Sequence, residues 1–298
     1  MRTRVFYAAK INIHGNIFSQ DLDELIKVHI PRVILESDSI KVNTWNWSFT
    51  DIENKEINGR QLITGNVTKS KHTTQKVRMG QKTVKKRSEH ELAHTCFFVY
   101  DINNEILIHE GTGAIKPHDF RKIFTTLLSK DIYVGEVKIK PIPEPHKLRQ
   151  ELLSIQNITT VKFHLIHPNP GKEEFNLYQK LIHENKLKEL EMSMQNRDGF
   201  PVVQDITPDG EPKFKEAIEN GITLVESGYG DIEFSGFDEI PVQGKRKKRI
   251  ERRKKTFSSR NSVRSIKTSE TNPVKLLQRI SSFIINVKEK QEDADEKP

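Results

Sequence analysis

The chain has 298 residues, of which 34% are hydrophobic and 30% charged, and its formal net charge at pH 7 is +8. This length allows one large or two ordinary domains, and no apolar run approaches the roughly 18–20 residues that a membrane-spanning helix needs. The N-terminus lacks the apolar segment of a secretory signal, and the single cysteine, Cys96, excludes an internal disulfide. We therefore expect a cytoplasmic protein without membrane insertion.

The first third of the sequence has mainly strand-like patterns. Alternating apolar residues predict a strand over Arg4–Ile13, and a helix is expected from Ser19 to Pro31. Apolar residues in Ile40–Phe49 form two alternating sets that are out of phase by one residue, which predicts one strand with a bulge. Gln61–Thr68 is its expected return strand.

Thr95–Leu128 has the clearest pattern, with two strands around a turn and then apolar residues at helical spacing. A strand over Tyr133–Ile139 follows. Three prolines within residues 141–145 then end the strand pattern, and this proline-rich segment predicts a domain boundary near Pro145.

The second half alternates helical and strand-like segments. A short helix is expected near Leu148–Leu153, and a second short helix is expected to end at Gly221. The remaining predictions are a strand over Thr159–His167, a helix over Glu173–Met194, two short strands within Ile222–Phe237, a strand over Thr256–Lys267 and a last helix from Pro273.

These elements predict an α+β fold. An antiparallel, β-rich domain with one or two helices is expected over residues 1–145, and a smaller α/β sandwich domain over residues 146–290. Residues 291–298 are acidic and are expected to form a flexible tail.

Two segments concentrate the positive charge. Lys245–Lys255, KRKKRIERRKK, contains nine basic residues and one acid, so its net charge of +8 equals that of the whole chain. Lys69–Ser88 contains eight basic residues and no acid, and it predicts a mobile loop or a long exposed hairpin. Because each segment carries +8, the rest of the chain has a net charge of −8. This distribution indicates a polyanionic partner, most simply nucleic acid.

We expect contacts to phosphates to dominate, because the basic run lacks interleaved aromatic residues and a helix-turn-helix pattern. Of the two nucleic acids, DNA is the expected partner rather than RNA, although the charge pattern itself does not separate them. An import signal, an anionic lipid and an acidic protein are the alternatives. The expected nucleic-acid-binding residues are Lys82, Lys85, Lys86 and Arg87 in the first segment, and Lys245, Arg246, Lys247, Lys248, Arg249, Arg252, Arg253, Lys254 and Lys255 in a loop in the second.

Residues Thr95–His167 resemble the RexA-like phage-exclusion proteins and the related KwaB-like anti-phage proteins. The resemblance lies in the order of features: CFFVYD, a second strand and helix, then GEVKIKPI and TTVKFHLI. The later segment NGITLVESGYGDIEFSGF is similar to the C-terminal half of families found in defence islands. The resemblance implies a cytoplasmic DNA-binding protein of phage defence that acts with a protein partner or as a homo-oligomer. It supplies no catalytic residues.

Two short motifs raise the possibility of metal chemistry. His90–His94 has the letters H-E-x-x-H, which bind zinc when both histidines lie one turn apart on a helix. Here the motif leads into a strand, where residues four apart are separated by about 13 Å. We therefore expect no metal and no cofactor.

The second motif is Glu136-Val137-Lys138 on an expected strand. A metal-dependent nuclease would pair such a carboxylate and lysine with an aspartate, for which Asp101 and Asp119 are candidates. A strand with one solvated face shows the same alternation, and that interpretation is preferred. The nuclease is kept as the alternative function.

Trp45 and Trp47 alternate on an expected strand. They are candidates for a base-stacking platform, but their large apolar area favours a place in the core.

Overall fold

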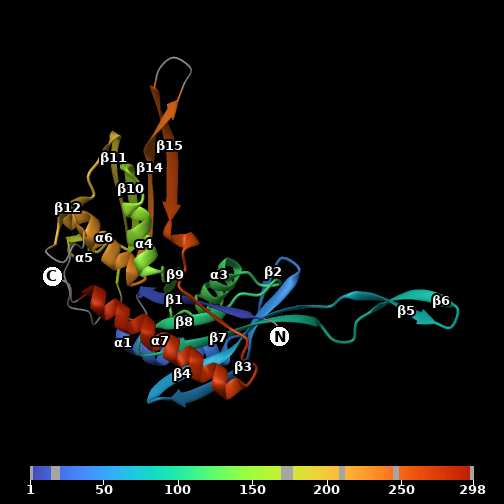
Figure 1. The fold of residues 1–298 in the computed structure, drawn as a ribbon. Coiled ribbons are helices and arrows are strands. Elements are labelled where there is room, and N and C mark those ends of the chain that lie inside the picture. The colour runs from blue at the N-terminus through green and yellow to red at the C-terminus, as the bar shows by residue number, and fades with distance from the viewer. Residues whose placement is uncertain (1–2, 15–20, 169–176, 208–211, 244–247, 296–298) are drawn as a thin grey trace. The chain divides into compact units, whose positions relative to one another are not determined.

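The computed structural model describes residues 3–14, 21–168, 177–207, 212–243 and 248–295 (Figure 1). The chain forms two compact units, and each combines segments that are distant in sequence. The first unit contains Met1–Tyr7, Ile13–Ile139 and Ser265–Asn286. The second contains Ala8–Asn12, Lys140–Arg264 and Val287–Pro298.

An eight-stranded sheet dominates the first unit, with the strand order β16-β1-β8-β7-β4-β3-β2 and with β9 also paired to β1. Its strands are β1 (Arg4–His14), β2 (Ile40–Val42), β3 (Trp45–Ile57), β4 (Arg60–Lys71), β7 (Leu92–Asp101), β8 (Ile106–Glu110), β9 (Glu136–Pro141) and β16 (Ser265–Thr268). A separate hairpin joins β5 (Thr74–Met79) to β6 (Lys82–Arg87). The helices are α1 (Leu22–Glu24), the π-helix η1 (Leu25–His29), α2 (Ile30–Glu36), α3 (Pro117–Leu128) and α7 (Pro273–Asp295), whose last residues belong to the second unit.

The second unit contains a four-stranded antiparallel sheet with the order β11-β10-β14-β15. Its strands are β10 (Asn157–Ile166), β11 (Glu189–Phe200), β14 (Gly230–Gln243) and β15 (Lys248–Ser258). The other elements are α4 (Pro145–Leu153), α5 (Leu177–Glu184), the small hairpin β12 (Val203–Ile206) and β13 (Pro212–Phe214), α6 (Glu216–Glu226) and the 3-10 helix η2 (Ser259–Asn261).

This architecture confirms the predicted α+β class with a large antiparallel sheet domain. The predicted hairpin and helix within Thr95–Leu128 are β7, β8 and α3. Phe120 and Phe124 of α3 pack against Phe98 of β7, with centroids 6.3 and 5.1 Å from the Phe98 ring. None of the helices in the described ranges is both long and apolar enough to cross a lipid bilayer.

Several local predictions are wrong. The helix expected to end at Pro31 continues through η1 and α2 to Glu36. The single strand expected over Thr256–Lys267 is instead the end of β15, the 3-10 helix η2 and then β16. Ile40–Phe49 is a hairpin of β2 and β3 rather than one bulged strand, and the turn that causes the phase change contains Asn43 with a φ of +56°. The predicted helix over Glu173–Met194 becomes a strand from Glu189, because Leu190, Met192 and Met194 alternate toward the core. Likewise, α6 extends through Ile222 to Glu226, where strands were expected.

Gly221 does not end a helix, as its residue type suggested, because it is a contact point between α6 and β10. A β-carbon at this position would lie 2.5 Å from two carbons of the Phe163 ring. Phe163 is fully buried in the core of the second unit. The glycine therefore allows the helix to approach the aromatic ring closely.

We expect Gly221→Ala to destabilise the protein by about 1–3 kcal/mol, because the overpacking in the core outweighs the better helix propensity of alanine. Urea unfolding followed by far-UV circular dichroism measures this. Gly113→Ala is the control, since a β-carbon there meets nothing within 4 Å. The double variant Gly221→Ala with Phe163→Leu should recover part of the stability that Gly221→Ala alone loses. An unchanged or higher midpoint for Gly221→Ala alone would refute the close packing.

Candidate nucleic-acid interface

The β5–β6 hairpin continues the central strand pair of the first unit. β4 and β7 are paired from Leu62–Asp101 to Lys71–Leu92, and β5 and β6 are then paired from Thr74–Arg87 to Met79–Lys82. All twelve residues of β5 and β6 are exposed. Figure 1 shows the hairpin extending away from the sheet of this unit. We call residues 74–87 the arm. Of the two structures predicted for the basic segment 69–88, the exposed hairpin is confirmed.

The two faces of the arm differ in chemistry. Directly paired residues share a face, so one face carries Lys76 opposite Lys85, together with Arg78 and Arg87. The other face carries Val77, Met79 and Val84, all exposed, with Lys82 and Lys86. The arm contains no carboxylate. Like charges directly opposite each other destabilise a strand pair, so the Lys76–Lys85 pair favours binding of an anion.

The expected binding residues Lys82, Lys85, Lys86 and Arg87 are therefore brought together on the arm. Sequence reasoning missed Lys76 and Arg78 as members of the site, although their spacing of two residues was a usable signal. Among the described residues, none of Lys76, Lys82, Lys85 and Lys86 forms an ion pair. Arg78 Nε donates to the carbonyl oxygen of Gly80 at 2.8 Å.

A hydrogen-bonded clamp fixes the base of the arm. Thr73 and Ser88 are joined by the bond from Ser88 N to Thr73 O, at 2.7 Å, and by the bond from Thr73 N to Ser88 Oγ, at 3.0 Å. Glu91 accepts hydrogen bonds from Ser70 Oγ at 2.5 Å and from Asn46 Nδ2 at 2.9 Å. The hydrogen bond from Ser70, followed by that from Asn46, holds the pKa of Glu91 below its ordinary value of 4.5. Through these two hydrogen bonds, the Glu91 carboxylate connects the start of β7 to Asn46 of β3 and Ser70 of β4.

The second basic segment is a strand rather than the predicted loop from Lys248 onward, and there it pairs with an acidic strand. Lys255 Nζ lies 2.6 Å from Asp238 Oδ2, and Arg252 Nε lies 3.7 Å from Glu239 Oε1. Arg253 is directly opposite Asp238 in the ladder. Sequence analysis missed these β14 carboxylates as partners, because strand register is not readable from the run itself.

The structure describes some of the remaining predicted residues of this segment but not others. Lys245, Arg246 and Lys247 lie outside the described residues. Lys248 and Arg249 are the first two residues of β15. Lys254 is opposite Phe237 and forms no ion pair within the described ranges. Its neighbour Arg252 also lies over the Phe237 ring, with 4.4 Å between Cζ and the centroid.

The H-E-x-x-H motif lies at a strand entry, as the sequence predicted. His90 and Glu91 precede β7, and His94 is on it. The Glu91 carboxylate accepts the hydrogen bonds from Ser70 and Asn46, and the His94 ring faces Trp45 with 5.6 Å between the centroids. Within the described residues, no group of three or more His, Cys, Asp or Glu side chains is placed to hold a metal ion.

Three residues of the nuclease alternative, Glu136, Lys138 and Asp101, have structural contacts. Glu136 and Lys138 of β9 are 3.2 Å apart and pair with each other. Asp101 is fully buried and accepts hydrogen bonds from the backbone N–H groups of Asn103 and Asn104, so it stabilises the turn between β7 and β8. Asp119 lies in the first turn of α3.

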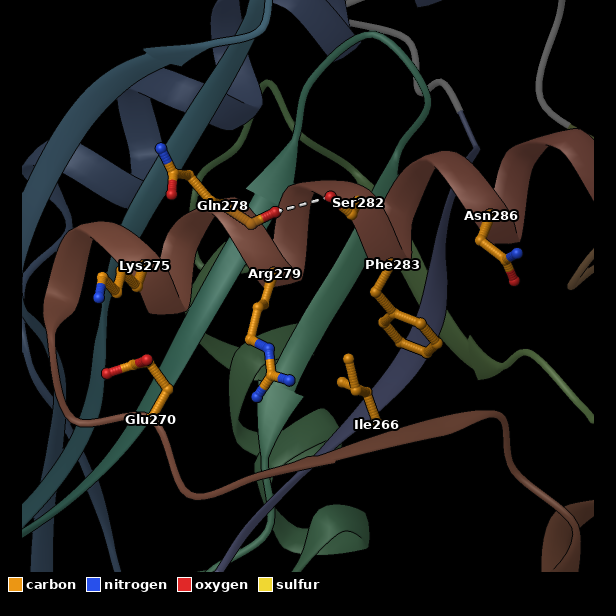
Figure 2. Close-up of a pocket in the computed structure, with 8 residues that line it drawn as sticks. All are labelled: Ile266, Glu270, Lys275, Gln278, Arg279, Ser282, Phe283 and Asn286. Atoms are coloured by element: carbon orange, nitrogen blue, oxygen red, sulfur yellow. Dashed lines mark hydrogen bonds between the residues drawn. The ribbon is translucent and has the colours of Figure 1, made fainter.

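An open groove of about 790 Å³ runs along α7 in the first unit (Figure 2). Its polar groups make local contacts: Arg279 donates to Thr268 Oγ1 at 2.8 Å, and Glu270 accepts from the backbone N–H groups of Thr271 and Asn272. Ser282 donates to the carbonyl oxygen of Gln278 at 3.0 Å. Glu270 is the one carboxylate among the described residues that line it, and it accepts hydrogen bonds from the adjacent backbone.

The arm and its clamp define a protein with a cationic β-ribbon supported by an antiparallel sheet. The chain belongs to the family described as a domain of unknown function, DUF4747, whose model matches residues 3–280. No curated protein matches the chain. The match covers most of both units and does not itself assign a function.

Substitutions in the H-E-x-x-H motif distinguish a clamp from a metal site. We expect Glu91→Ala to speed amide hydrogen exchange at residues 69–73 and 88–95, because the link from Asn46 and Ser70 is lost. His90→Ala should leave exchange unchanged, and it is the matched control. Equal effects of both substitutions, together with one zinc per chain by elemental analysis, would instead support a metal site.

The clamp also predicts a pH dependence. Because the pKa of Glu91 is lowered in the folded protein, its carboxylate stabilises the fold fully at neutral pH, above its ordinary value of 4.5. This contribution is lost as the pH falls through the lowered pKa. The difference in unfolding midpoint between the natural protein and Glu91→Ala should therefore shrink in acid, and a difference that grows there would contradict the assignment.

Proposed function

We propose that this protein binds DNA without sequence specificity and that the arm is its main phosphate-contacting element. The observation that supports this is the arm itself, which carries six basic side chains and no acid, with Lys76 directly opposite Lys85. A two-stranded ribbon fits the major groove of B-DNA. Six paired residues at about 3.3 Å each give an arm about 20 Å long, enough to reach several phosphates.

The chemistry of the arm favours phosphate contacts over base readout. Lysine and arginine bind phosphates through charge, and this binding releases counterions regardless of sequence. The basic face lacks the Asn and Gln side chains that read adenine. An acidic protein surface is the alternative partner of the arm, and failure of the protein to bind either duplex in the following test would favour it.

The arm should govern the salt dependence of binding. We expect Lys76→Gln with Lys85→Gln to weaken binding to any duplex by a similar factor. The slope of log affinity against log salt concentration should flatten by about 0.9 for each lost phosphate contact. Binding isotherms at several salt concentrations, on two unrelated sequences, measure this.

The matched control for this test is Lys27→Gln with Lys55→Gln. It removes the same charge from lysines that are paired with Asp23 at 2.8 Å and Glu53 at 2.7 Å. Equal losses of affinity in the two double variants would mean that only net charge matters and would overturn the assignment to the arm.

Removing the acids that face β15 should change DNA affinity in the opposite direction. Asp238 and Glu239 engage Lys255 and Arg252, so these cations are partly neutralised in the free protein. We expect Asp238→Asn with Glu239→Gln to raise DNA affinity and to steepen the salt slope, because two cations are released for phosphates. No change in either quantity would show that β15 does not contact DNA. A role for Lys245–Arg249 stays a prediction from the sequence.

We also propose that the protein acts in phage defence, on the basis of the sequence resemblance over Thr95–His167. A DNA-binding arm is compatible with a sensor or an effector in such a system. The genes that neighbour this one test the proposal: defence genes would support it, and a housekeeping operon would count against it.

A further inference from the structure

We infer that the base of the arm holds a second subsite, which stacks one unpaired nucleobase of a single-stranded nucleic acid on Trp45. This inference rests on the proposed nucleic-acid binding and adds a ligand class to it. Four residues from three neighbouring strands make the subsite. They are Trp45 of β3, Lys69 and Lys71 of β4, and His94 of β7.

The strand register brings these residues to one face of the sheet. Trp47, Lys69 and His94 are directly paired across β3, β4 and β7. Trp45 and Lys71 lie two residues further along their strands, toward the arm, and so share that face. Trp47 is only 7% exposed and belongs to the core, as the sequence favoured for both tryptophans. Trp45 is partly exposed, so that preference does not hold for it.

The contacts of Trp45 are those of an aromatic platform flanked by cations. Lys71 Nζ lies 4.1 Å from the Trp45 centroid, and Lys69 Nζ lies 4.9 Å from it. The His94 ring approaches from β7 at 5.6 Å with an interplanar angle of 55°. Cations over an indole face add attraction to a site that also binds bases by stacking.

The two lysines have different roles. Lys69 Nζ donates to the carbonyl oxygen of Ala114 at 2.5 Å, which fixes its position. Lys71 forms no ion pair with the described residues, so it can move from the indole to a phosphate when a base occupies the ring. Glu91, the acid near this part of the sheet, is engaged by Asn46 and Ser70.

These features select an anionic ligand with a flat ring. Lys69 and Lys71 repel a cationic ligand such as a methylated lysine. An acidic peptide would satisfy the lysines but would leave the indole without a partner. A nucleotide supplies both groups, and a base inside a duplex has no free face to offer. A nucleotide in a single strand therefore fits the site best.

The test uses intrinsic fluorescence and abasic oligonucleotides. In the Trp47→Phe protein, Trp45 is the only tryptophan. A single-stranded oligothymidylate of about ten nucleotides should quench its fluorescence. An oligonucleotide of the same length with abasic sugars keeps the phosphates and should bind roughly 5- to 150-fold more weakly, the range that corresponds to stacking of one base. Trp45→Leu should abolish this difference.

The outcomes separate the subsite from the arm. No quenching, or equal affinity for the two oligonucleotides, would overturn the stacking subsite even if duplex binding persists. Lys76→Gln with Lys85→Gln should weaken binding of both oligonucleotides equally and preserve quenching at saturation. Quenching with full affinity in that double variant would keep the subsite and refute the arm as the phosphate-binding element.

Discussion

The pairing of β4 with β7 supports both the cationic arm and the proposed stacking subsite of the first unit. An isolated two-stranded hairpin is marginally stable in water, so an arm of exposed residues depends on the sheet from which it emerges. At the inner end of this strand pair, Phe98 packs against the aromatic residues of α3. At the outer end, Glu91 and the Thr73–Ser88 pair connect the sheet to the arm. The core packing and the cationic arm therefore lie along the same pair of chain segments, first as the β4–β7 ladder and then as the separate β5–β6 ladder.

Two basic segments of equal net charge have different electrostatic roles. On the arm, Lys76 and Lys85 are opposite each other, and no acid relieves their repulsion. On β15, the strand register places Asp238 and Glu239 opposite Arg253 and Arg252. Cross-strand neighbours decide how much of a cation's charge is available to a ligand. Charge density along the sequence is therefore a poor measure of binding potential in a β-ribbon.

The same dependence on register applies to the H-E-x-x-H motif. Its residue types alone suggest a zinc site. Because the motif lies where β7 begins, Glu91 and His94 instead make separate contacts. Glu91 accepts hydrogen bonds from Asn46 and Ser70 near the base of the arm, and His94 of β7 faces Trp45 of β3 on the same face of the sheet. One motif thereby contributes to the support of the arm and to the proposed stacking subsite. Both contributions depend on where the backbone places the two side chains.

The sequence by itself determined the α+β class, the first strand, the hairpin and helix within Thr95–Leu128, and the exposed hairpin as one of two alternatives for the basic segment. Local periodicity records which face of an element is buried, so these elements were readable. Only the tertiary structure decided that Gly221 lies inside a helix against Phe163, that strand β11 replaces a helix, and that β15 is paired with acids. These outcomes depend on partners far away in the chain. A pattern confined to neighbouring residues does not specify which distant strand supplies the opposing side chain.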